Sequence, residues 1–225
     1  MHQWDFSPVF SNLDFLLLGL YHTFLVTALA LSFGIPIGLA LALCRLSRFR
    51  LVSGVATFII EFFRTTPPLV QLFWFFFALP ILIDVRMTPF VASVATFSIQ
   101  SSAFFAEIFR GGINSIERGQ WEAAKAIGMS YRQSLRRIIL PQAVKRMIPA
   151  FLERSIELLK TTTLISTVSY ADLMFQANEL AQKTFRPLEV YTVVALMYFF
   201  LIFGFSYASI HVERFLAKSG ESTMR

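Results

Sequence analysis

Charged side chains that interrupt apolar segments are the first candidates for chemistry in this sequence. Glu153, Glu157 and Lys160 are spaced i, i+4 and i+7, which places them on one face of a helix. Glu157 follows Met147 by ten residues, a rise of about 15 Å along a helix. Two acidic side chains on one face repel each other unless a nearby positive charge neutralises them. That charge could belong to Arg154 and Lys160, or to the ammonium or guanidinium group of a substrate.

A second group of polar residues precedes or lies within other apolar segments. Glu61 and Arg64 are spaced i, i+3 and form an ion pair within one helix in the simplest interpretation, or contact a substrate in the other. Gln100, Ser101 and Ser102 could donate hydrogen bonds to a ligand or satisfy one another between helices. Ionisable groups inside a membrane are costly and therefore functional candidates. The candidate substrate path thus comprises Glu61, Arg64, Gln100, Glu153, Glu157 and Lys160.

No catalytic or metal-binding pattern accompanies these residues. A phosphate-binding loop ends in Gly-Lys-Ser/Thr, and none of the five lysines follows a glycine. The histidines, His2, His22 and His211, are scattered, and no Cys/His/carboxylate spacing predicts a metal site. We therefore expect neither catalytic residues nor a metal in this chain.

The elements that position the candidates are predicted to be membrane-spanning helices. Of the 225 residues 56% are hydrophobic and only 15% are charged, too few charges to cover a water-exposed surface. Four segments lack any charged residue over roughly the 20 positions that a helix needs to cross a bilayer, and a weaker fifth carries charges. We predict one all-α membrane domain, residues 1–225, with five spans at 15–44, 57–83, 87–109, 147–170 and 189–211.

Basic residues predict the orientation of these spans. The first 44 residues contain no Lys or Arg, whereas Arg45, Arg48 and Arg50 follow the first span directly, and residues 110–146 are strongly basic. Lys and Arg collect on the cytoplasmic side of a membrane protein. The N-terminus is therefore predicted to lie outside and the C-terminus in the cytoplasm. The net charge of +6 is read as this signal, and nucleic-acid binding is not expected.

The cytoplasmic loop 110–146 contains an amphipathic, basic stretch, "EAAKAIGMSYRQSLRRIILP". Residues 116–127 predict an alanine-rich helix that Gly128 ends in the left-handed conformation. A second helix is predicted to begin near Ser130 and to close at Pro141. Physics alone leaves two roles open: a helix lying on anionic lipid, or a docking surface for a soluble partner.

The amino-acid sequence of this loop resembles a known motif. Glu122-Ala123-Ala124, followed by Gly128 and then by "IILP", is similar to the EAA loop of permease subunits of bacterial ABC importers. "FFRTTPPLVQLFWFF", "AEIFRGGINSIERGQWEAAKAIGMS", "RRIILPQAVKRMIPA" and "LLKTTTLIS" resemble, in the same order, the polar amino acid branch, which includes histidine, glutamate, glutamine, arginine and opine permeases.

The resemblance implies a fold and a set of partners. It implies the type I importer fold, pairing with a second copy or a sister permease, and a coupling helix to which Glu122, Ala123, Ala124 and Gly128 belong. That helix would contact a dimer of cytoplasmic ATPase subunits, which bind the ATP and Mg, so that this chain needs no cofactor. An extracytoplasmic solute-binding protein would deliver the amino acid, and the complex would lie among lipids of the bacterial inner membrane.

The sequence also differs from the residues that are usual in that family at several positions of the fourth predicted span. Glu153-Arg154 replaces Asn-Glu, Glu157 replaces a small or apolar residue, and Thr161 replaces Asp. Glu157 hints at a ligand with a positive group beyond its α-amine. The alternative to transport is a membrane scaffold or sensor that docks a cytoplasmic partner; a secondary transporter is disfavoured because we find no inverted repeat.

Overall fold

All of the secondary structure that the computed structural model describes is helical. The description covers residues 3–221, with side chains as far as His211. The α-helices are α1 (Ser7–Phe10), α2 (Leu13–Arg45), α3 (Arg50–Thr65), α4 (Pro68–Phe73), α5 (Leu79–Ile83), α6 (Pro89–Asn114), α7 (Arg118–Ala126), α8 (Tyr131–Ser134), α9 (Leu140–Thr161), α10 (Leu173–Thr184) and α11 (Pro187–Glu221). Two π-helical turns, η1 (Trp74–Ala78) and η2 (Leu135–Ile139), and a 3₁₀-helix, η3 (Thr162–Val168), link them. The predicted all-α class is confirmed for the described residues.

Within the described chain, three helices are long and apolar enough to cross a membrane: α2, α6 and the Pro187–His211 part of α11. They match the predicted spans 15–44, 87–109 and 189–211. A fourth crossing results if the bent pair Arg50–Thr65 and Pro68–Ile83 counts as one span. The charged α9 is not among them, and residues 147–170 form the end of α9 followed by the 3₁₀-helix η3. The fifth span therefore stays a prediction.

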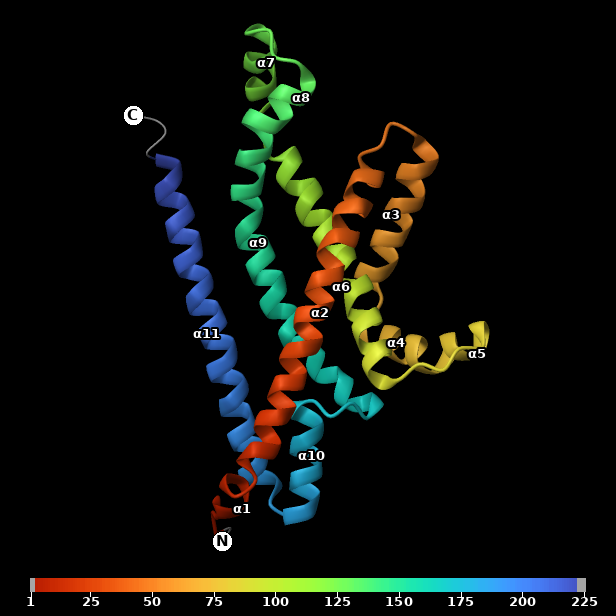
Figure 1. Ribbon diagram of the computed structural model, residues 1–225, viewed down its shortest axis with the longest axis vertical. Helices are drawn as coiled ribbons and strands as arrows, with labels where there is room; N and C mark the ends of the chain where they lie inside the picture. The colour runs from red at the N-terminus through yellow and green to blue at the C-terminus, as the bar shows by residue number, and fades with distance from the viewer. Residues whose placement is uncertain (1–2, 222–225) are drawn as a thin grey trace.

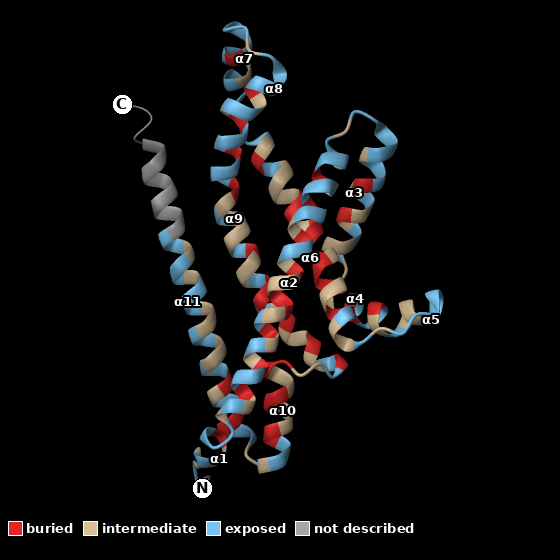
Figure 2. Ribbon diagram, in the orientation of Figure 1, coloured by how far each residue is buried: buried red, intermediate tan, exposed pale blue. Residues whose placement is uncertain are grey.

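The close contact between α2 and α6 forms the centre of the bundle. Buried residues collect where these helices meet each other and the lower part of α9, while α11 is largely exposed (Figure 2). Gly34 and Gly38 of α2 face α6: a Cβ atom at Gly38 would lie 2.7 Å from the carbonyl oxygen of Ser102, and one at Gly34 would lie 3.1 Å from that of Ser98. These two glycines therefore let the backbones of α2 and α6 approach closely.

The second predicted span is broken. Helix α3 ends at Thr65, and the following helix runs at 106° to it, so residues 57–83 do not form one straight helix. The cause lies in the sequence Thr66-Pro67-Pro68. A proline forces the preceding residue into an extended conformation, and Thr66 has φ −79° and ψ 134°. Pro68 then begins α4, because the first turn of a helix has no use for the N–H that proline lacks.

Pro141 does not close the helix that contains it, contrary to the prediction. The helical run that begins at Tyr131 continues through η2 into α9 as far as Thr161. In η2 the N–H of Leu140 donates to the carbonyl of Leu135, five residues back. This wider turn changes the hydrogen-bond register just before Pro141, where a regular helix would bring the proline ring against the carbonyl four residues earlier. A π-helical turn also precedes Pro80: in η1 the N–H of Leu79 donates to the carbonyl of Trp74.

The two ends of the bundle carry different elements. The α2–α3 loop and the α7–α8 segment lie at one end, whereas α1, α10 and the start of α11 lie at the other (Figure 1). Arg48 and Arg50 are thus at the same end as the basic segment 118–137. The fold agrees with one shared basic side. That this side faces the cytoplasm stays a prediction.

Helix α10 is attached to α2 through a buried carboxyl group. Asp172 has no exposed surface, and its Oδ1 accepts the N–H of Phe175 at 2.9 Å as the N-cap of α10. Its Oδ2 has no hydrogen-bond partner among the described residues. Gly19 of α2 makes room for this turn, since a Cβ there would lie 2.9 Å from the backbone oxygen of Asp172. Burial raises the pKa of Asp172 from 3.8 to about 7, against the lowering effect of the Phe175 N–H.

Asp172→Asn should flatten the pH dependence of stability. Because the carboxyl pKa is higher in the folded than in the unfolded chain, the wild type binds more protons when folded and loses stability as the pH rises from about 4 to about 7. Asparagine keeps the N-cap but does not ionise. The thermal unfolding midpoint in detergent is therefore expected to fall between pH 5 and pH 8 for the wild type and to change less for the variant. Parallel curves would contradict a buried, titrating Asp172.

Candidate functional site

The α7–α8 segment projects from the bundle as a compact knob (Figure 1). Glu122 and Ala123 are exposed, and Ala124 is 1% exposed. Gly128 has φ +77°, the left-handed conformation that the sequence predicts for it. Ser130 then begins α8 with a capping box: its hydroxyl accepts the N–H of Gln133, whose side chain accepts the N–H of Ser130. The predicted first helix is slightly shorter than expected, Arg118–Ala126.

The knob helix α7 and the segment before it pack against the helical run that leads into α9. Trp121 of α7 stacks on Tyr131 of α8 with ring centroids 5.5 Å apart. Below this pair, Ile116 packs in one cluster with Ile139 and Met147. Because α8, η2 and α9 form one continuous helical run, α7 is fastened to the end of a long rod. A displacement of the knob would carry that rod with it.

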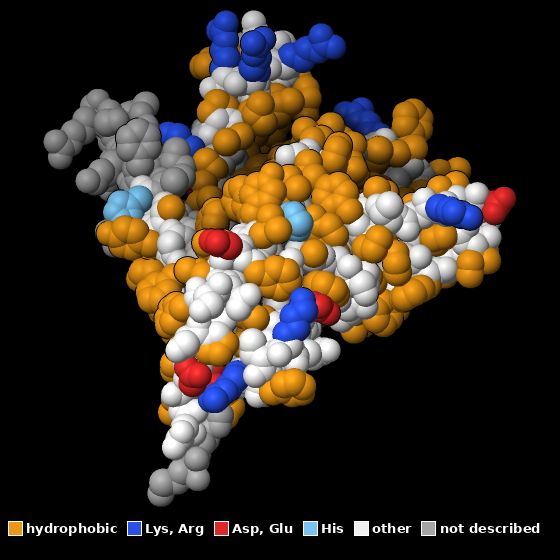
Figure 3. Space-filling model, turned by 60° about the horizontal axis from the view of Figure 1, so that its bottom comes forward, with side chains coloured by type: hydrophobic (Ala, Val, Ile, Leu, Met, Phe, Trp, Pro, Cys, Tyr) orange, Lys and Arg blue, Asp and Glu red, His pale blue; other side chains and the backbone are white. Residues whose placement is uncertain are grey.

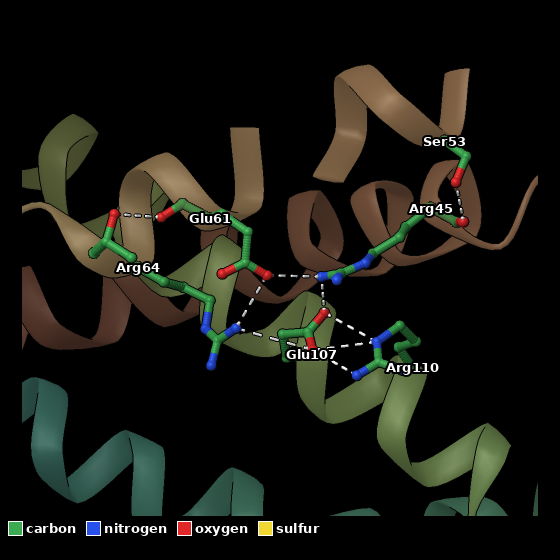
Figure 4. Close-up of polar contacts among 7 residues, drawn as sticks. Arg45, Ser53, Glu61, Arg64, Glu107 and Arg110 are labelled. Atoms are coloured by element: carbon green, nitrogen blue, oxygen red, sulfur yellow. Dashed lines mark hydrogen bonds and ion pairs between the residues drawn. The ribbon is translucent and has the colours of Figure 1, made fainter. Parts of the chain in front are cut away.

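Five charged side chains from three helices meet in one cluster, defined here as the ion cluster (Figure 4): Arg45 of α2, Glu61 and Arg64 of α3, and Glu107 and Arg110 of α6. Glu61 lies 3.3 Å from Arg45 and 3.5 Å from Arg64. Glu107 is hydrogen-bonded to Arg45 and lies 2.8 Å from Arg110 and 3.9 Å from Arg64. Two carboxylates thus face three guanidinium groups, so the ion cluster carries one excess positive charge.

The ion cluster confirms one prediction and extends it. The Glu61–Arg64 pair within α3 is present as expected, but Arg45, Glu107 and Arg110 were not expected to join it. Arg45 and Arg110 served only as signals of orientation. Glu107 could have been found, because it is the first charge after the long uncharged stretch of α6 and stands three residues before Arg110. Contacts between helices far apart in sequence were not accessible from local spacing.

Glu153, Glu157 and Lys160 lie at one-face spacing on α9, and all three are exposed. Within this chain Glu157 forms an ion pair with Arg154, whose Nη1 lies 2.7 Å from the Glu157 carboxylate. The Arg154 side chain is buried, whereas that of Glu157 is 61% exposed. The structural interpretation therefore holds for Arg154, and the outer part of Glu157 remains accessible.

Arg154 connects α9 to α6 through an aromatic ring. Its guanidinium carbon lies 3.6 Å from the ring centroid of Phe104, and that of Arg64 lies 5.6 Å from the same centroid. Cations within about 6 Å of an aromatic centroid are attracted by the ring quadrupole. One phenyl ring thus contacts guanidinium groups from α3 and α9, at the edge of the ion cluster. Sequence reasoning missed Phe104 because nothing in its local pattern sets it apart from neighbouring core residues.

The polar residues of α6 do not satisfy one another. Gln100, Ser101 and Ser102 are all buried, and Ser102 donates to the carbonyl of Ile99 in its own helix at 2.6 Å. Among the described residues, Gln100 Oε1 and Ser101 Oγ have no hydrogen-bond partner. Ser101 lies against Gly34 at the α2–α6 contact. Of the two alternatives, mutual hydrogen bonding among these three residues is not seen in the described part of the chain.

Comparison with known proteins identifies relatives over nearly the whole chain. The family model described as "Binding-protein-dependent transport system inner membrane component" matches residues 34–217. The chain is 36% identical over 213 residues to the probable glutamine ABC transporter permease protein GlnM of Bacillus subtilis (strain 168), covering 95% of this chain and 98% of that protein. It is 34% identical over 210 residues to the arginine transport system permease protein ArtQ of the same organism, covering 93% and 96%.

Solved structures show the same fold. The crystal structure of an amino acid ABC transporter with histidines matches with a TM-score of 0.90 and 34% identity, over 95% of this chain and 99% of that one. A methionine ABC transporter, MetNI, in an inward-facing conformation matches with a TM-score of 0.73 over 92% and 98% of the two chains. Its identity of 19% supports the fold alone.

Glu107→Gln should destabilise the bundle more than Glu61→Gln. Glu107 is the better buried acid of the ion cluster, with 17% of its side chain exposed against 46% for Glu61, and its loss leaves Arg110 without an acid in the cluster while Arg45 and Arg64 keep only Glu61. Removing one member of a buried ion pair leaves uncompensated charge, here a loss of about 2 kcal/mol, against less than about 1 kcal/mol for the more exposed Glu61. Thermal unfolding in detergent measures both; equal losses would refute a central role for Glu107.

Proposed function

Because the chain belongs to the family of binding-protein-dependent transport system inner membrane components, we propose that it is the subunit through which an ATP-driven importer moves polar amino acids or related small zwitterions into a bacterial cell. It is a multi-pass membrane permease. Relatives named for glutamine and arginine transport support the polar amino acid class. The bacterial inner membrane is the proposed location.

The observation that carries the mechanism is the projecting knob on a continuous rod. ATP, with Mg, would be bound and hydrolysed by a dimer of cytoplasmic ATPase subunits, while this chain does no chemistry. Glu122 and Ala123 lie exposed on α7, where a cleft of the ATPase could receive them. Closure of the ATPase dimer would push α7, and the α8–α9 rod would pass that displacement into the membrane as a rigid-body movement. A second copy of the chain or a sister permease would cover part of the surface that is exposed in this single chain.

The substrate would pass along the exposed face of α9. Glu153, Glu157 and Lys160 lie there, and Glu61 and Arg64 border the same region through Phe104 and Arg154. An amino acid carries an ammonium and a carboxylate, so a path with both acidic and basic groups suits it. Gln100 would add a hydrogen-bond acceptor from α6. An extracytoplasmic solute-binding protein would supply the amino acid at the opposite end of the bundle from the knob.

Gly128→Val should separate ATP hydrolysis from uptake. A β-branched residue cannot adopt φ +77° without strain, so the angle between α7 and α8 changes although no neighbouring atom is struck. In proteoliposomes containing the transporter, ATPase and binding protein, we expect uptake per ATP hydrolysed to fall about tenfold or more. Glu122→Ala should act in the same direction.

Gly119→Ala is the matched control for this experiment. Gly119 lies in α7, nine residues before Gly128; it also has open space around it and has no positive φ, so alanine should leave both rates near those of the wild type. Unchanged uptake with Gly128→Val would remove the coupling role of the knob. Loss of uptake together with loss of membrane insertion would show a folding defect, which fluorescence of a tagged variant during size-exclusion chromatography detects.

Glu157→Gln should change which amino acids are carried. The exposed carboxylate is available to a cationic group, so uptake of arginine or lysine is expected to fall relative to glutamine by about tenfold, the value of a lost charge-assisted hydrogen bond. Competition of labelled substrate by unlabelled amino acids measures the ratio. Glu153→Gln, one turn earlier, tests whether the position or only the net charge matters. An unaltered ratio would mean that Glu157 serves only to neutralise Arg154.

A further inference from the structure

An apolar groove lies between three helices, α2, α9 and α11. Its lining includes Phe24 and Ala28 of α2, Leu152 and Ile156 of α9, and Ile202 and Phe205 of α11. The groove has a volume of about 210 Å³. A dry apolar cavity of about 150 Å³ is large enough to bind benzene, so this space admits a short stretch of hydrocarbon. It is too small to enclose a whole drug-sized ligand, whose pockets begin at about 300 Å³.

The hydroxyl groups in the lining of this groove are already engaged. Thr27, Ser155 and Ser209 each donate to a carbonyl oxygen of their own helix, at 2.8, 2.7 and 2.9 Å respectively. The lining contains no charged side chain. An amino acid, which carries two charges, would lose its hydration in this groove without compensation. The groove is therefore separate from the proposed substrate path.

The wall of the groove that α11 forms belongs to the surface that a bilayer would cover. Only 6% of the most apolar part of α11 is buried within the chain. Figure 3 shows hydrophobic side chains over the flanks of the bundle, with Lys and Arg side chains gathered at the far end, over the knob. In Figure 1 the α9 and α11 ribbons diverge toward that same end. Hydrocarbon of the bilayer can therefore reach the groove between these two helices.

Large side chains in the lining favour lipid over a second copy of the chain as the occupant. Helices that associate within a membrane usually do so through small residues, which let the backbones approach each other. Here Phe24 of α2 and Phe205 of α11 stack with ring centroids 6.3 Å apart, and both rings remain partly exposed. These rings would keep a further helix at a distance. A single acyl chain is narrow and flexible enough to lie beside them.

A basic residue continues the α9 wall of the groove toward the knob. Lys145 precedes Leu152 by seven residues and Ile156 by eleven, which is the spacing of one helix face. It is exposed and lies about 10 Å from Leu152 along the helix. No Asp or Glu occurs between Glu122 and Glu153, so no acidic residue of this segment neutralises it. Lysine near the end of a spanning helix extends its ammonium group to the level of the lipid headgroups.

We propose that this groove binds one acyl chain of an anionic phospholipid and that Lys145 contacts the phosphate of its headgroup. The acyl chain would lie between the α8–α9 rod and α11 and fill the space between them. Basic residues beside the ends of spanning helices attract anionic headgroups, and the apolar groove adds a contact for the chain below. The inference requires a membrane-inserted protein but does not depend on what the protein transports.

The test is native mass spectrometry of the full-length permease with its partner subunits, purified in detergent and titrated with phosphatidylglycerol. We expect one tightly held lipid per copy of this chain. Ala28→Phe should fill the groove and raise the lipid concentration for half-maximal occupancy about tenfold or more, because each excluded methylene group weakens binding. Lys145→Ala should raise it about fivefold, the effect of one basic residue at an anionic membrane surface. Phosphatidylcholine, which has no net charge, should bind the wild type and Lys145→Ala alike.

Ala95→Phe is the matched control, because Ala95 lines a different apolar hollow, between α2 and α6. Its titration, and that of Lys125→Ala on the knob, should match the wild type. Titrations of Ala28→Phe and Lys145→Ala that also match the wild type would overturn the lipid site while leaving the proposed importer intact. A loss of permease dimer in Ala28→Phe with unchanged lipid retention would assign the groove to a second copy instead. If size-exclusion chromatography shows that Ala28→Phe misfolds, the exposed Lys145→Ala decides the outcome.

Discussion

The close approach of α2 and α6 is the contact on which the other elements depend. It exists because glycines at positions 34 and 38 let the two backbones meet without intervening side chains. Gly19, on the same helix, admits α10 in the same way. With lipid on the outside there is little hydrophobic gain in bringing helices together, so such close packing must supply the attraction. Helices α3, α9 and α10 then attach to this pair, whereas α11 lies more loosely against the bundle.

Charge attaches the remaining helices where packing alone would not. The ion cluster joins α3 to α2 and α6, directly beside the break at Thr66 where α3 stops packing as a straight span. Arg154 joins α9 to α6 through Phe104. Each of these contacts pairs a charge with an opposite charge or a ring quadrupole, which lowers the cost of keeping ions near the bilayer. Such contacts can be exchanged for others at modest cost, unlike the glycine-mediated packing of α2.

Local features of the fold could be predicted from the sequence, and features that depend on distant contacts could not. The uncharged runs located α2, α6 and α11, and the glycine in the α7–α8 corner was assigned its left-handed conformation correctly. The prolines were harder: Pro67 turns the chain by 106°, whereas Pro141 is absorbed by a π-helical turn. Thr66 is extended before Pro67, whereas the π-helical turn shifts the hydrogen-bond register just before Pro141. The partners of Glu107 and Arg154 lie on other helices, beyond the reach of spacing rules.

The route of a displacement follows from these two kinds of contact. In the proposed cycle the knob moves, and the rod that contains Pro141 and Arg154 moves with it, since no break in the helix separates them. Deeper in the bundle that rod contacts α6 through the Arg154–Phe104 stack, and Arg64 of the ion cluster approaches the same ring. A shift of α9 therefore alters the surroundings of Arg64, while the glycine-packed α2–α6 pair keeps its place. In this cycle the movement of α9 would change its polar contacts with α6, because the tightly packed α2–α6 contact leaves no space for displacement.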